Sequence, residues 1–179
     1  MESSDQNIRE YTMGFGKAQF LALFLCIPLL ALLLLPYYYL YGFENLNIVF
    51  NLWFILSLVL AIVAHELLHG IGWAYYADGG MKSIKFGFNW KAITPYCHCK
   101  APLQVKHYKI GAALPLIVLG LLPVAIALII ESGTFLAFGI ILSCAAGGDI
   151  LALIMLAKLN NEKWVYDHPE KMGFISKEC

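Results

Sequence analysis

Four apolar segments govern what this chain of 179 residues can fold into. They run from Ala18 to Tyr41, Leu46 to Tyr76, Tyr108 to Ile130 and Thr134 to Ala157. Each is long enough to cross a bilayer as an α-helix, which takes about 20 apolar residues. Hydrophobic residues make up 60% of the chain and charged residues 13%, which excludes a disordered chain and argues against an ordinary soluble domain. The segments predict an all-α integral membrane protein with four transmembrane helices, folded as one domain over residues 1–179.

One of these segments contains a cluster of ionisable side chains. The sequence His65-Glu66-Leu67-Leu68-His69 lies in the run from Leu46 to Tyr76, which has no other acidic or basic residue. An ionisable group in lipid is so costly in free energy that it indicates a functional site. Residues four apart share one face of a helix, so the two imidazoles can bind one metal ion with Glu66 beside it.

Asp149 is the single charged residue of the fourth segment. It lies nine residues before Lys158, and His69 lies nine residues before Asp78, so both lie about 13 Å inside their helix ends at a rise of 1.5 Å per residue. Equal depth predicts a shared site with Asp149 as third ligand. The preceding Gly147-Gly148 pair should let this helix approach the second one. The alternative is that Asp149 is a polar contact that holds helices together.

Two imidazoles and a carboxylate form the three-ligand set of a catalytic zinc ion, with a fourth position left for water. Zinc would lower the pKa of that water toward about 7, and Glu66 would act as general base and pass the proton to the leaving amine. The predicted function is a membrane-embedded zinc metalloprotease that acts on a membrane protein or peptide. Its ligands are His65, His69 and Asp149.

Two other functions use the same residues. One is a zinc transporter or sensor, and the other is an inactive relative that binds membrane segments. A binding site needs no base such as Glu66, whereas hydrolysis does. A transport path also requires polar groups across the bilayer, and the first and third segments offer almost none. We therefore favour the protease.

Lysine and arginine positions predict the orientation. Basic residues precede the first segment, fill the loop of residues 78–107 and occur in the tail of residues 158–179, whereas the two other loops have none. Because basic residues accumulate in cytoplasmic loops, we expect both termini and the loop 78–107 to be cytoplasmic, in the inner cell membrane. The 12 basic and 12 acidic residues show no cluster of the kind that binds nucleic acid.

The loop 78–107 is predicted to contain a short β-hairpin. Apolar residues alternate with polar residues or glycine from Lys82 to Asn89, which is the period of a strand, and a second strand is expected from Ala92 to Cys97. A hairpin beside the zinc site would hold an extended substrate as an added strand.

The motifs resemble those of known families. His65-Glu66-Leu67-Leu68-His69, followed by an aspartate in a later span, resembles the site-2 protease superfamily of intramembrane zinc metalloproteases. Together with four further motifs it is similar to a small bacterial family of putative zincin peptidases: His98-Cys99-Lys100-Ala101-Pro102-Leu103, Leu114-Pro115, Gly148-Asp149-Ile150 and Asp167-His168-Pro169. The resemblance implies His65 and His69 as zinc ligands, Glu66 as catalytic base and Asp149 as third ligand. Site-2 proteases often place an asparagine where Leu114 precedes Pro115, so the sequence assigns no oxyanion stabiliser.

Other side chains offer rival sites. Asp167 or His168 could fold back as the third ligand, or form a turn at the membrane surface. Cys97, His98 and Cys99, with His107 nearby, could bind a second metal, although neighbouring residues on a strand point to alternate faces. The other interpretation of this cluster is that it packs or shapes the loop.

Overall fold

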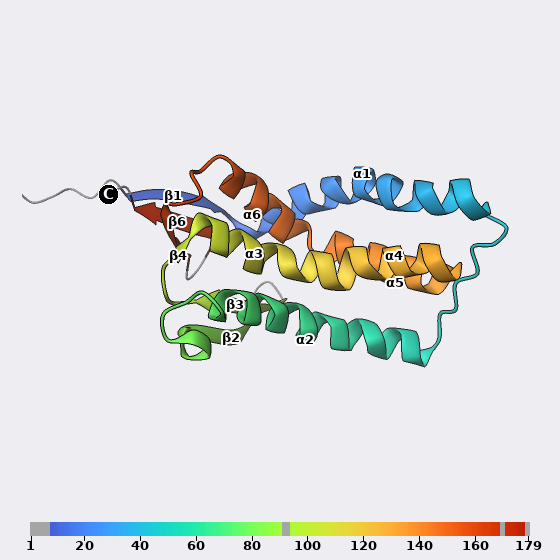
Figure 1. Ribbon diagram of the computed structural model, residues 1–179, viewed down its shortest axis with the longest axis horizontal. Helices are drawn as coiled ribbons and strands as arrows, with labels where there is room; N and C mark the ends of the chain where they lie inside the picture. Colours follow the sequence, from blue (N-terminus) through green and yellow to red (C-terminus); the bar gives the residue numbers. More distant parts are fainter. Residues whose placement is uncertain (1–7, 91–93, 169–170, 178–179) are drawn as a thin grey trace, which may run out of the picture.

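The computed structural model describes residues 8–90, 94–168 and 171–177. Long helices run side by side, and the strands gather at one end of them (Figure 1). Along the chain the helices are α1 (Phe15–Tyr41), α2 (Leu52–Ala74), α3 (Val105–Pro115), α4 (Leu122–Ile130), α5 (Gly133–Ala145) and α6 (Gly147–Ala157). A 3-10 turn, η1 (Gly80–Ser83), follows α2, and a π-helical segment, η2 (Leu116–Leu121), joins α3 to α4.

Three helices are long and apolar enough to cross a membrane: α1, α2 and the continuous run Val105–Ile130. The bent pair α5 and α6 would be a fourth span. Many of their apolar side chains face outward, as Ile27 and Leu60 do with exposures of 67% and 70%. Such surfaces suit a lipid environment, so the helices are compatible with a membrane protein.

Strands at the helix ends correct the expectation of an all-α protein. β1 (Ile8–Met13), β6 (Met172–Lys177), β5 (Trp164–Asp167) and β4 (Leu103–Gln104) form an antiparallel sheet in the order β1-β6-β5-β4. The chain ends therefore pair with each other, and Tyr11 of β1 stacks on Phe174 of β6 with ring centroids 5.3 Å apart. β1 and β4 pair only with strands that are distant in sequence, and β5 and β6 are short strands that join them, so no local pattern predicted this sheet. The fold is mixed α and β.

A second sheet is the hairpin of β2 (Ile84–Asn89) and β3 (Thr94–Cys99), in which Phe86 pairs with Cys97. The hairpin was expected, but its second strand ends at Cys99, two residues later than predicted. Ala92, where that strand was expected to begin, lies outside the described residues.

The fourth apolar segment is broken, contrary to the expectation of one continuous helix. α5 and α6 meet at Ala146 with a bend of 53°. A Cβ atom on Gly147 would lie 2.8 Å from the Cβ of Ala22 in α1, so this glycine allows close approach of α1 and not of α2. The bend places Asp149 in the first turn of α6.

The second helix is also shorter than expected. It begins at Leu52, where the side chain of Asn51 accepts a hydrogen bond from the Phe54 amide at 2.9 Å, and residues 46–50 before it are not helical. A side chain of this kind satisfies one of the free amides of the first turn. After Ala74 the chain turns through Gly79, whose φ of 87° few side chains allow.

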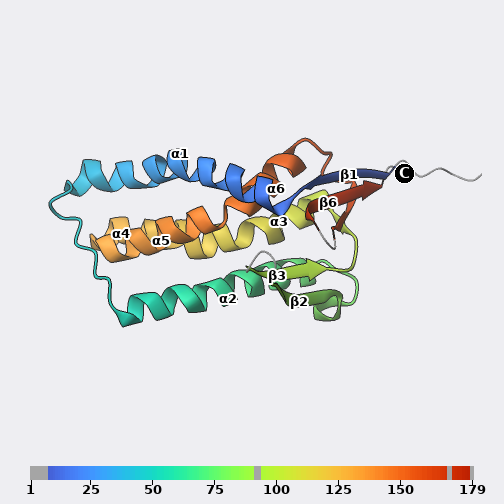
Figure 2. The ribbon, with the colours of Figure 1, turned by 180° about the vertical axis from the view of Figure 1, so that it is seen from behind.

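Figures 1 and 2 show α1 and α2 on opposite sides of the molecule, with α3, α4 and α5 between them. α2 and α3 approach closely where a Cβ on Gly72 would lie 2.7 Å from Gly111 Cα. At the end with the strands, side chains of α2, α3, α6 and the sheets share one buried core, which includes Trp73, Tyr108 and Leu156. The candidate metal centre lies where these three helices meet.

Candidate metal centre

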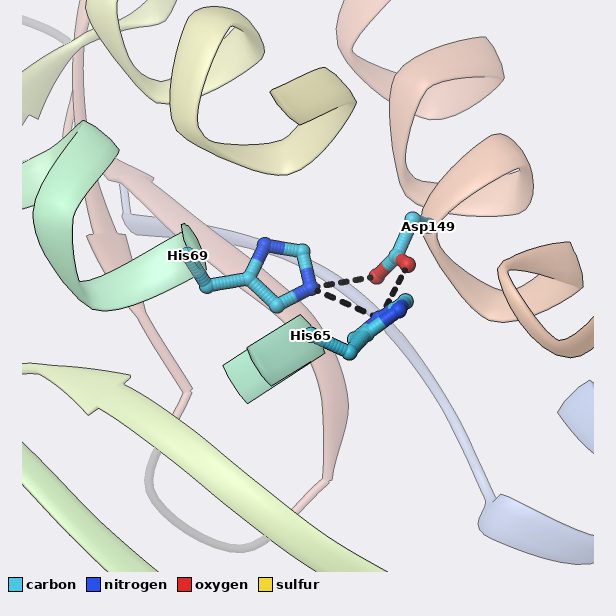
Figure 3. A group of neighbouring side chains, drawn as sticks. All are labelled: His65, His69 and Asp149. Atoms are coloured by element: carbon cyan, nitrogen blue, oxygen red, sulfur yellow. Dashed lines mark hydrogen bonds and ion pairs between the residues drawn. The ribbon is translucent and has the colours of Figure 1, made fainter. Parts of the chain in front are cut away.

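Three side chains from two helices converge on one point (Figure 3). His65 and His69 project from α2, one turn apart, and Asp149 projects from α6. His65 Nε2 lies 3.0 Å from Asp149 Oδ2, His69 Nε2 lies 3.2 Å from Asp149 Oδ1, and the two Nε2 atoms are 3.2 Å apart. The equal depth of His69 and Asp149 expected from the sequence is consistent with this convergence.

The spacing of these atoms fits zinc. Zinc–nitrogen and zinc–oxygen bonds of about 2.0–2.2 Å at tetrahedral angles place neighbouring ligand atoms roughly 3.3–3.5 Å apart. The three observed separations of 3.0–3.2 Å are slightly shorter, and each pair combines atoms that bind zinc in proteins. In the described residues this is the one group of three or more His, Cys, Asp or Glu side chains that could hold a metal ion.

The environment of His69 selects the nitrogen that faces the site. Its side chain is 7% exposed, its Nδ1 lies 2.9 Å from the carbonyl oxygen of Gly111 in α3, and its ring stacks on Trp73 at 5.1 Å. A carbonyl only accepts hydrogen bonds, so the proton of the neutral imidazole is on Nδ1. Nε2 is then the nitrogen that faces Asp149 and His65 and that can bind a metal ion.

Glu66 is half-buried on the same helix and remains outside the ligand group. Its carboxylate interacts electrostatically with His69, His65 and Asp149, and with the backbone of Cys97 in β3. The carboxylate therefore lies near the three candidate ligands and beside the hairpin. This is the placement that a general base needs.

The hairpin packs directly on the helix that carries the motif. A Cβ on Gly70 would lie 2.5 Å from the Phe86 ring, so this glycine admits the ring against α2. Phe86 pairs with Cys97, and both belong to the part of the hairpin nearest Glu66. The loop expected to flank the site therefore does so.

Asp167, a rival third ligand from the sequence, lies in another cluster. Its Oδ2 accepts hydrogen bonds from His98 Nδ1 at 2.9 Å and from the Cys99 amide at 3.2 Å, and its Oδ1 accepts one from the Tyr108 hydroxyl at 2.8 Å. His168 Nδ1 accepts from the Lys171 amide, and Pro169 lies outside the described residues. Asp167 of β5 therefore links the hairpin to α3. Among the described residues, the tail adds no side chain to the group of His65, His69 and Asp149.

The residues suggested for a second metal site have structural contacts instead. Burial raises the pKa of the Cys97 thiol and raises that of Cys99 to about 11. His98 is paired with Asp167, and the ring of His107 stacks on Tyr76 at 4.1 Å. Among the described residues these side chains do not form a group that could hold a metal ion, so the cluster shapes the loop.

Two residues around His69 were missed by the sequence analysis. Trp73 lies four residues after His69, so the spacing that linked the two histidines also placed the tryptophan on that face. The Gly111 carbonyl is signalled in its own helix only by Pro115, four residues later, which lacks the N–H that normally uses such an acceptor.

Comparison with known proteins gave one match. A family model described as "Putative zincin peptidase" matches residues 58–164, a range that contains the motif of α2, the hairpin and Asp149. No curated protein and no solved structure matches the chain.

Proposed function

The chain belongs to the family of putative zincin peptidases, and we propose that it is a membrane-embedded zinc metalloprotease. The match over residues 58–164 confirms the resemblance to this family that the motifs indicated. The observation that carries the proposal is the convergence of His65, His69 and Asp149, whose ligand atoms all lie within 4.8 Å of one another. A relationship to the site-2 proteases is part of the proposal, supported by the motif and by an aspartate on a later span.

When held by these three residues, zinc supplies Lewis-acid polarisation of the scissile carbonyl and lowers the pKa of the attacking water toward about 7. The carboxylate of Glu66 takes a proton from that water and delivers it to the leaving amine. Because His69 and His65 are 7% and 14% exposed, little bulk water competes with the substrate.

The substrate class follows from the position of the site. His65, Glu66 and His69 lie in the last three turns of a helix that is apolar enough to cross a membrane. A peptide bond that reaches them lies near the end of a transmembrane segment or in a chain bound at the membrane surface. We therefore propose membrane proteins or peptides as substrates, an inner cell membrane location, and cytoplasmic termini.

The hairpin of β2 and β3 is the proposed guide for the substrate. It lies against α2 beside Glu66, and a peptide must be extended before its carbonyl can reach the metal ligands. The change Phe86→Pro is expected to reduce hydrolysis without loss of zinc, and unchanged turnover would remove this role.

The test combines zinc content with hydrolysis in purified, detergent-solubilised protein. Labelled casein and a synthetic transmembrane peptide in phospholipid vesicles serve as probes. We expect the wild type to contain one zinc ion per chain and to cleave at least one probe. Glu66→Gln should keep the zinc and lose cleavage, whereas Glu10→Gln, an exposed carboxylate on β1, should lose neither.

Other results would contradict the proposal. Zinc-loaded wild type that leaves both probes intact but releases zinc across the vesicle membrane would indicate a transporter. Equal cleavage by Glu66→Gln and the wild type would exclude Glu66 as the base.

A further inference from the structure

Pro115, the last residue of α3, interrupts the hydrogen bonds of its helix at one defined atom. In an α-helix each N–H donates to the carbonyl four residues earlier, and proline has no N–H. The carbonyl of Gly111 therefore has no donor from residue 115. The next amide along the chain, that of Leu116, donates to Ala113 instead. Gly111 is left with a free acceptor in an apolar span, where an unsatisfied carbonyl is costly.

A side chain of the candidate metal centre donates a hydrogen bond to this free acceptor. His69 Nδ1 lies 2.9 Å from the Gly111 oxygen, and the imidazole reaches it because α2 and α3 touch at Gly72 and Gly111. Pro115 is fully buried, so no water beside it donates to the Gly111 carbonyl in place of the missing N–H.

We infer that Pro115 is a positioning residue for the metal ligand His69, an inference that rests on the proposed zinc site. By leaving the Gly111 carbonyl free, the proline provides the acceptor that keeps the His69 proton on Nδ1. Nε2 then points its lone pair toward Asp149 and His65. Outer partners of this kind commonly change metal affinity by 10–100-fold, because they fix both the tautomer and the ring orientation.

A helical N–H at position 115 would compete for the same carbonyl. The bond it offers lies along the helix axis, whereas His69 approaches from the side of α2, and a shared acceptor holds each donor less well. Pro115→Ala introduces this competitor and removes a residue that is unfavourable inside helices. The variant is therefore expected to fold at least as well as the wild type.

The experiment measures zinc affinity by competition with a chelator in the full-length protein. We expect the zinc dissociation constant of Pro115→Ala to rise about tenfold or more. The control is Pro123→Ala, a buried proline at the start of α4 in the same apolar run, which should change the constant by less than about twofold. The melting temperature of metal-free Pro115→Ala should not fall, which separates loss of a ligand's orientation from loss of fold. Wild-type zinc affinity in Pro115→Ala would overturn the inference.

A second readout needs neither zinc nor substrate. In metal-free protein with nitrogen-15-labelled histidine, assigned with a His69→Ala variant, the wild type should show a His69 Nδ1 proton that is hydrogen-bonded and exchanges slowly with solvent. In Pro115→Ala that proton should exchange faster, and an unchanged exchange rate would contradict the inference. If the wild type bound no zinc, the proposed function would fail while this readout still decided the role of Pro115.

Discussion

Two aspartate and histidine pairs in this molecule have similar geometry and different chemistry. Asp149 lies 3.0 Å from His65 inside the helix bundle, and Asp167 lies 2.9 Å from His98 among the strands. The oxygens of Asp149 face the nitrogens of two imidazoles, all directed at one point. The oxygens of Asp167 are occupied by three donors, those of His98, the Cys99 amide and the Tyr108 hydroxyl.

The two clusters share a motif but differ in their surroundings. A short distance between a carboxylate and an imidazole is common to both clusters. The clusters differ in the partners of their polar atoms. The ligand atoms of His65, His69 and Asp149 contact one another around a shared point, as the ligands of one metal ion would. The Asp167 carboxylate instead accepts hydrogen bonds from β3 and α3 and so links both to β5.

The sharpest test of this contrast replaces one histidine in each cluster. His69→Ala removes one of three ligands, so the purified protein should retain almost no zinc. His98→Ala should keep the wild-type zinc content, because its ring contacts only the network of Asp167 among the interactions described. The zinc content per chain is measured for both variants after the same dialysis. Equal zinc loss in the two variants would contradict the distinction between the Asp149 and Asp167 clusters.

The next largest effect concerns Glu66, which lies beside the Asp149 cluster but is not one of its proposed ligands. Glu66→Gln removes the proposed base and retains a side chain of the same shape. Turnover should fall by about 10²–10⁴-fold, the usual contribution of general base catalysis. The zinc content should stay at the wild-type level. A variant that loses zinc in parallel with activity would instead assign Glu66 to the ligand group.

For the second cluster the expected effect is on stability. Asp167→Ala leaves the Tyr108 hydroxyl and the His98 ring without their acceptor, and a buried donor without a partner costs about 1–3 kcal/mol. The free energy of unfolding should fall by at least that amount, while the zinc content stays unchanged. Glu162→Ala, which removes an exposed ion pair with Lys106, should cost less than about 1 kcal/mol. Loss of zinc in Asp167→Ala, at temperatures where it is folded, would show that the clusters are coupled.

The smallest effect is on the reactivity of Cys99. The pKa of this thiol is raised to about 11, chiefly by burial and also by the charge of Asp167, against the lowering effect of the hydrogen bond that the thiol donates to the Ala101 carbonyl. Because the thiolate is the reactive form, alkylation at pH 7 should be slow and should accelerate up to about pH 11. A variant with Cys99 as the single cysteine allows the measurement, and Asp167→Asn in that background should lower the pKa. The unfolded chain, with a thiol pKa of about 8.5, is the reference. Rapid alkylation of the folded protein at pH 7 would contradict the burial of Cys99.

The sequence predicted what depends on local patterns. Hydrophobicity located the apolar helices, and the spacing of His65 and His69 placed both on one face of α2. The alternating residues of β2 predicted its strand within one hairpin. The depth of Asp149 could be estimated because helix rise is constant, even though its helix is broken.

What was missed depends on partners distant in the chain. β1 forms a strand because β6 lies beside it. Neither segment is long or apolar enough to be predicted as a strand from its own sequence. The bend of 53° at Ala146 follows from packing, since Gly147 contacts α1 and no proline marks the break. Pro115 was visible in the sequence, but its consequence was not, because only the structure shows that His69 reaches the carbonyl it leaves free.

The most direct test of the central claim is to locate zinc in crystals of the wild-type protein by anomalous scattering at the zinc absorption edge. A peak is expected about 2.0–2.2 Å from the Nε2 atoms of His65 and His69 and from a carboxylate oxygen of Asp149. A peak beside Asp167 and His98, or a fully zinc-loaded protein with no peak between α2 and α6, would contradict it.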